Sequence, residues 1–129
     1  MGELKRIVFF TIQKLESGHY SLRTRDGFSF DYKGITLTIH SEGSDERLCV
    51  SDAESGLLVK TFDIYNSEVR GFMSKAERVV DRVYKLKTFH DDLRNMRKTE
   101  YYKNVKKAYK CLLEARSYMK NAERLRGGN

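Results

Sequence analysis

The stretch that decides the fold is residues 28–39, which reads Phe28-Ser29-Phe30-Asp31-Tyr32-Lys33-Gly34-Ile35-Thr36-Leu37-Thr38-Ile39. On both sides of Lys33-Gly34, apolar side chains alternate with polar ones. A period of two places successive side chains on opposite faces of a strand. The stretch therefore predicts two strands with one apolar face turned toward helices, and that face consists of Phe28, Phe30, Tyr32, Ile35, Leu37 and Ile39.

Strand-like alternation extends through the first half of the chain. Further candidate strands occupy residues 6–15, 19–25, 47–51 and 57–62. Asp26-Gly27 is the strongest hairpin dipeptide, because glycine accepts the positive φ that a two-residue turn demands. Neighbouring strands joined by such short loops cannot be parallel. We therefore expect an antiparallel sheet of about five strands, a meander, in residues 1–65.

The period changes from strand to helix at Asn66-Ser67-Glu68. Ser67 is a good N-cap, and Glu68 suits the positive end of a helix dipole. Apolar residues then recur at helical spacing, and the predicted buried set is Val69, Phe72, Ala76, Val79, Val80, Val83 and Leu86. We expect residues 66–97 to form an amphipathic helix on the sheet. Around residues 88–92 the pattern fits a continuing helix and a break equally well.

The last third of the chain holds the net charge. From Arg97 to Arg126 there are ten Lys or Arg and three Glu, a balance of +7 that equals the charge of the whole chain. A basic helix is expected over residues 98–126. With 129 residues in total, the sequence predicts a single α+β domain in which the sheet is followed by two long helices.

One side of the basic helix follows a heptad register. Its apolar positions alternate in steps of four and three, which is the pattern of a packed helical seam. The seam consists of Tyr101, Val105, Ala108, Leu112, Ala115, Met119 and Ala122. Two interpretations stay open: packing on the preceding helix as an antiparallel hairpin, or formation of a homodimer.

The sequence contains no motif that identifies a reaction. It has no G-x-S-x-G, P-loop or G-x-G-x-x-G. His19, His40 and His90 stand apart from any second His or Cys at ligand spacing, so we expect no metal site, no cofactor and no enzyme.

Composition indicates the compartment. No apolar run approaches the roughly 18 residues of a membrane span, so no membrane contact is expected. The apolar start of the chain lacks a cleavage site and is interpreted as a strand. Cys49 and Cys111 lie in different predicted elements and are expected to be reduced thiols in a cytoplasmic protein.

The basic helix is the candidate binding surface. Lysine and arginine neutralise phosphates, and tyrosine stacks on bases. The candidate residues are Lys98, Lys103, Lys106, Lys107, Lys110, Arg116, Lys120, Arg124, Tyr102 and Tyr109. We expect a small non-enzymatic module that contacts DNA or RNA phosphates with weak sequence preference. The alternative is a protein-interaction or inhibitor module, of the kind that phages and mobile elements encode. Its basic face would dock on an acidic or nucleic-acid-binding groove of a host protein complex.

Overall fold

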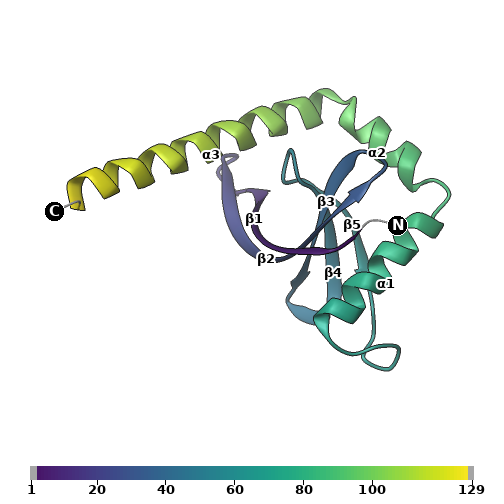
Figure 1. Ribbon diagram of the computed structural model, residues 1–129. Helices are drawn as coiled ribbons and strands as arrows, with labels where there is room; N and C mark the ends of the chain where they lie inside the picture. Colours follow the sequence, from purple (N-terminus) through teal and green to yellow (C-terminus); the bar gives the residue numbers. More distant parts are fainter. Residues whose placement is uncertain (1–2, 128–129) are drawn as a thin grey trace.

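The computed structural model describes residues 3–127, and in the last helix it describes side chains as far as Ser117 and that of Met119. Five antiparallel strands form one sheet in the order β1-β2-β3-β4-β5, and three helices follow it (Figure 1). The elements are β1 Lys5–Lys14, β2 Tyr20–Tyr32, β3 Ile35–Glu42, β4 Ser44–Asp52, β5 Leu58–Asp63, α1 Phe72–Lys85, α2 Phe89–Arg97 and α3 Glu100–Gly127. The predicted α+β fold with an N-terminal meander is confirmed.

The predicted turn at Asp26-Gly27 is wrong, because β2 passes straight through it. These residues pair with Val8 and Ile7 of β1. A Cβ on Gly27 would lie 2.0 Å from the carbonyl oxygen of Ile39, so glycine serves a close backbone approach rather than a turn.

The hairpin turn lies instead at Lys33-Gly34. Both residues have positive φ, 51° and 84°, as a type I′ turn requires. Tyr32 and Ile35 on either side of the turn are direct partners in the β2–β3 ladder. The turn therefore fixes the register of the stretch that decides the fold.

The apolar face of that stretch forms the core as predicted. Phe28, Phe30, Tyr32, Leu37 and Ile39 are each at most 2% exposed, while Ile35 is half-buried. Helices α1 and α2 cover this face. Their buried contacts are Ala76, Val79, Val80, Val83, Phe89 and Leu93.

Helix α1 begins at Phe72, so the prediction that Ser67 caps it is wrong. Gly71, with φ 92°, stands at the N-terminal boundary of the helix and contributes no side-chain cap. Glu68 precedes the helix and forms an ion pair with Arg82, at 2.8 Å. Of the predicted buried set, Val69 and Phe72 are only half-buried. Leu86 is 38% exposed because the helix has already ended.

The segment predicted as one helix over residues 66–97 is two helices. The backbone of Leu86 is extended, and α2 begins after Thr88 with Asp91 and Asp92 in its first turn. A second break follows at Thr99, whose hydroxyl accepts a hydrogen bond from the backbone N–H of Tyr102 and caps α3. Three helices thus replace the two that the sequence predicted.

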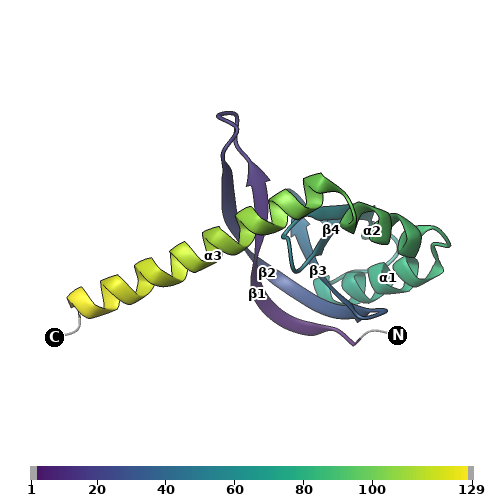
Figure 2. The same cartoon turned by 90° about the horizontal axis from the view of Figure 1, so that it is seen from above.

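Helix α3 crosses one end of the sheet, and its C-terminal part extends beyond the β1–β2 hairpin (Figure 1, Figure 2). It does not form an antiparallel hairpin with α2, so that interpretation of the heptad seam is wrong. Tyr109 instead donates a hydrogen bond to the carbonyl of Phe10 in β1 at 2.8 Å. The sheet therefore holds the basic helix directly.

Candidate nucleic-acid interface

Asp52, at the end of β4, anchors the start of α3 to the sheet. Its side chain is fully buried. Oδ1 accepts hydrogen bonds from the backbone N–H groups of Glu54 and Ser55, from the Ser55 hydroxyl and from the Tyr102 hydroxyl, at 2.9 to 3.3 Å. Oδ2 accepts from Arg97. Both oxygens of the buried carboxylate thus accept hydrogen bonds.

Glu54 extends this anchor onto the first turns of α3. Its carboxylate pairs with Arg97 at 3.2 Å and with Lys106 at 2.9 Å. The hydrogen bond from Lys106 is the main cause that lowers the pKa of Glu54. Together, Asp52 and Glu54 fix the orientation of α3, and therefore the direction in which its solvent face points.

Tyr102 and Tyr109 belong to the buried side of α3. They are 3% and 7% exposed, and burial raises the pKa of both phenols. The sequence predicted that these two tyrosines contact a nucleic acid, but so little of either side chain is exposed that the structure does not present their rings for stacking on a base. With Val105, they follow the i, i+3, i+7 spacing of a core-facing stripe, a signal that the sequence already contains.

Lys103, Lys107 and Lys110 form what we call the lysine row, at i, i+4 and i+7 on α3. All three are exposed. Lys103 lies 3.5 Å from Glu100. Within the described side chains, Lys107 and Lys110 have no carboxylate within 4.0 Å. The row therefore presents positive charge to solvent on a rigid element.

The other predicted cations have different surroundings. Lys106 is committed to Glu54. The guanidinium of Arg116 lies 4.7 Å from the centre of the Phe10 ring, so it helps to hold α3 on β1. The side chains of Lys120 and Arg124 lie outside the described residues.

Lys98 lines a shallow pocket between α2 and the turn that joins β2 to β3. The pocket has a volume of about 430 Å³. We call it the basic pocket, and its lining residues are Lys33, Ile35, His90, Arg94, Arg97 and Lys98. None of these is acidic, and Nδ1 of His90 is buried without a hydrogen-bond partner among the described residues. The pocket is therefore suited to an anion.

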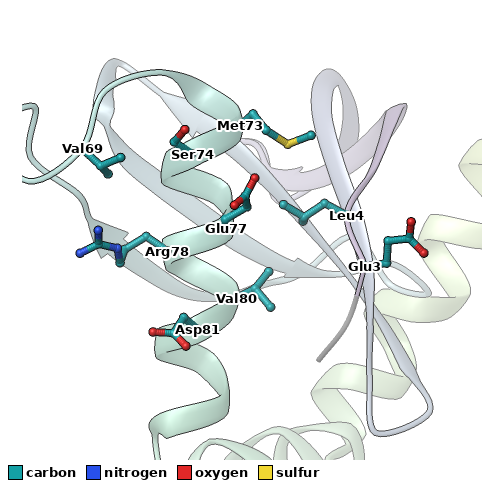
Figure 3. Close-up of a pocket in the computed structure, with 9 residues that line it drawn as sticks. All are labelled: Glu3, Leu4, Val69, Met73, Ser74, Glu77, Arg78, Val80 and Asp81. Atoms are coloured by element: carbon teal, nitrogen blue, oxygen red, sulfur yellow. The ribbon is translucent and has the colours of Figure 1, made fainter.

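The larger groove along α1 has a different character (Figure 3). It has a volume of about 760 Å³ and lies between α1 and the segment that contains Glu3 and Leu4. Glu3, Glu77 and Asp81 line it, against Arg78 as the only cation of the lining. Its acidic balance disfavours phosphate, so the basic pocket is the better anion site.

The heptad seam is not uniformly buried in the structure. Val105 is fully buried, whereas Tyr101 and Met119 are 55% and 62% exposed. The buried side of α3 consists of Tyr102, Val105 and Tyr109, which coincides with the seam only at Val105. The side chain of Ala122 lies outside the described residues. A homodimer through the seam remains a prediction, since the described chain is a single copy.

Comparison with known proteins gives no family. No protein-family model, no curated protein and no solved structure matches the chain. Within residues 3–127, none of the helices is both long and apolar enough to cross a bilayer. The chemistry of the surfaces described above is therefore the basis for a function.

The sequence-based view that His40 stands apart from other ligands is wrong. In the β3–β4 ladder, His40 is the direct partner of Cys49. Glu42 Oε2 lies 3.4 Å from His40 Nε2 and 3.9 Å from Cys49 Sγ. Burial lowers the pKa of His40 and raises the pKa of the Cys49 thiol. Burial therefore favours the uncharged form of both side chains.

Proposed function

We propose that the protein is a non-enzymatic nucleic-acid-binding module that contacts phosphates through the lysine row and the basic pocket. The observation that carries the proposal is the basic pocket, whose lining has four Lys or Arg side chains, a histidine and no carboxylate. Of the four cations, Arg97 is paired with Asp52 and Glu54, which leaves Lys33, Arg94 and Lys98 for an anion. Lys98 lines that pocket and lies two residues before the start of α3. The basic pocket and the lysine row are therefore close along the chain.

The anchoring of α3 supports the same proposal. A helix held by the buried Asp52 network presents its lysines at fixed spacing, so little ordering entropy is lost when a polyanion binds. Each lysine that neutralises a phosphate releases counterions, which favours association at low salt. The lysine row therefore acts as a preorganised phosphate-contacting surface.

Weak sequence preference follows from the groups that are available. The two tyrosines are buried, so base stacking by their rings is absent from this face. Lysine contacts phosphate as a point charge and reads base edges less specifically than the forked guanidinium of arginine. We place the module in the cytoplasm, where its two free thiols would stay reduced.

The test is fluorescence anisotropy with labelled random-sequence single-stranded DNA, duplex DNA and RNA across a salt series. The proposal expects binding that weakens steeply with salt. Log affinity should fall by about 0.7–0.9 per phosphate contact for each log unit of salt, depending on strandedness. Different random sequences should bind alike.

Charge-matched variants separate a local site from a general charge effect. Lys103→Glu/Lys107→Glu/Lys110→Glu removes the lysine row. Its control is Lys5→Glu/Lys14→Glu/Lys60→Glu, three exposed lysines on strands, which lowers the net charge of +7 by the same six units. The proposal expects the row variant to lose binding and the control to retain most of it.

Lys33→Glu/Arg94→Glu tests the basic pocket separately, because it leaves the Arg97 anchor in place. This variant should also weaken binding. Unchanged affinity in both the row and the pocket variants would contradict the proposal. No binding of the wild-type protein to any of the three nucleic acids at about 50 mM salt, where attraction is strong, would also contradict it. Absence of binding by the wild type would favour the alternative, in which the basic face binds a protein partner with an acidic groove.

A further inference from the structure

Three potential metal ligands of different chemistry converge on strands β3 and β4. His40 and Cys49 face each other across the ladder and are 3% and 4% exposed. Glu42 follows two residues after His40, and the β3–β4 register shifts between Ser41 and Glu42. Such irregularities re-aim side chains. The ligand atoms of His40, Glu42 and Cys49 all lie within 4.8 Å of one another.

The two distances from Glu42 are close to those around a tetrahedral zinc ion. Zinc binds imidazole nitrogen at about 2.0–2.1 Å, carboxylate oxygen at about 2.0–2.2 Å and thiolate sulfur at about 2.3 Å. Tetrahedral angles then separate nitrogen from oxygen by about 3.3 Å and sulfur from oxygen by about 3.5 Å. In the structure, Glu42 Oε2 lies 3.4 Å from His40 Nε2 and 3.9 Å from Cys49 Sγ. The third separation, between the ring nitrogen of His40 and Cys49 Sγ, is within 4.8 Å. Tetrahedral zinc requires about 3.6 Å between these two atoms, so the two side chains must move closer together when the metal binds.

Arg25 holds the Glu42 carboxylate in the required orientation. Its Nη2 donates to Glu42 Oε1 at 3.3 Å, which leaves Oε2 directed toward His40 and Cys49. Arg25 is itself fixed, because its Nε donates to the hydroxyl of the buried Thr11 at 3.0 Å. Outer partners of this kind orient the ligands in metal sites.

The cluster borders a small pocket of about 180 Å³. His40 and Glu42 both line it, together with polar groups that include Thr11, Arg25 and Ser51. We propose that His40, Glu42 and Cys49 bind one zinc ion, with the fourth coordination position open to this pocket. The mixed nitrogen, oxygen and sulfur donors select zinc over magnesium or calcium, which prefer oxygen alone. Cys49 binds as the thiolate, and its proton passes to solvent.

Titration of the untagged, metal-free protein tests this site. Cobalt(II) chloride is the spectroscopic probe, and zinc chloride is added by calorimetry. We expect one equivalent of either metal to bind, with a thiolate-to-cobalt charge-transfer band. Cys49→Ser should abolish the band, and Cys111→Ser, which changes the exposed second cysteine, should leave it unchanged.

Two more variants keep the test decisive. Glu42→Gln changes a side chain that is 45% exposed, so the fold should tolerate it, and zinc affinity should fall at least about tenfold. His19→Gln, which changes an exposed histidine outside the cluster, should bind zinc like the wild type. No stoichiometric metal binding by the wild type, a band retained in Cys49→Ser, or an unchanged affinity in Glu42→Gln would overturn the proposal.

Discussion

Replacing Asp52 with Asn tests the anchor that holds α3 on the sheet. The amide oxygen can keep the four hydrogen bonds that Oδ1 accepts, while the NH₂ group replaces Oδ2 and faces the donor Arg97. Removing one partner of a buried ion pair costs about 3–5 kcal/mol. Arg97 keeps Glu54 as a partner at 3.2 Å, so we expect the lower end, about 3 kcal/mol.

The assay is urea unfolding followed by circular dichroism at pH 7, where a domain of this size has about 5–15 kcal/mol of stability. The control is Asp63→Asn, which breaks an exposed pair with Arg47 and should cost less than about 1 kcal/mol.

A double-mutant cycle isolates the ion pair. Arg97→Met alone leaves the Asp52 charge buried without its cation, whereas Asp52→Asn/Arg97→Met removes both charges. The double variant should therefore lose less stability than the two single variants added together, by at least about 1 kcal/mol. Additive losses, or a loss below about 1 kcal/mol in Asp52→Asn, would refute the anchor.

Three further predictions concern stability and use the same unfolding assay. Val80→Asp should cost at least about 3 kcal/mol, because it puts an unpaired charge at a position that is 4% exposed; a smaller loss would contradict the packing of α1. Gly56→Ala should destabilise the protein more than Gly34→Ala. Both glycines have positive φ, but a Cβ at Gly56 would lie 2.6 Å from the Tyr109 ring, whereas a Cβ at Gly34 would meet open space. Equal losses of stability in the two variants would contradict the contact between Gly56 and Tyr109. Folding lowers the pKa of Glu54, so the ionised carboxylate stabilises the fold above the unfolded pKa of about 4.3, and this stabilisation is lost as the pH falls through the folded pKa. The difference in free energy of unfolding between the wild type and Glu54→Gln should therefore shrink from pH 7 to pH 3. A difference that stays constant over this range would contradict the ion pairs of Glu54.

Local periodicity was sufficient to predict the sheet and its buried face. Alternation over residues 28–39 identified the side chains that became the core, because a strand with one buried face repeats every two residues. The same local signals misplaced Asp26-Gly27 and Ser67. Each is a good turn or cap residue by itself, but glycine also permits close backbone approach, as at Gly27.

The candidate sites depend on contacts that local patterns do not contain. Asp52 reads as a turn residue in the sequence, yet it meets Arg97 and Tyr102 from 45 and 50 residues away. His40 and Cys49 become neighbours only through the register of β3 and β4. By contrast, the burial of Tyr102 was predictable from helical spacing, and charge segregation alone located the lysine row.

The most direct measurement of the central claim is the salt dependence of nucleic-acid affinity for the wild type and the two charge-matched lysine variants. We predict a steep slope for the wild type. The control with substitutions at Lys5, Lys14 and Lys60 should keep a similar slope. In the lysine-row variant, the slope should decrease by about 2–3, since three phosphate contacts are lost. Equal slopes and equal affinities in the two variants would show that net charge alone governs binding, and would contradict a phosphate-contacting surface on α3.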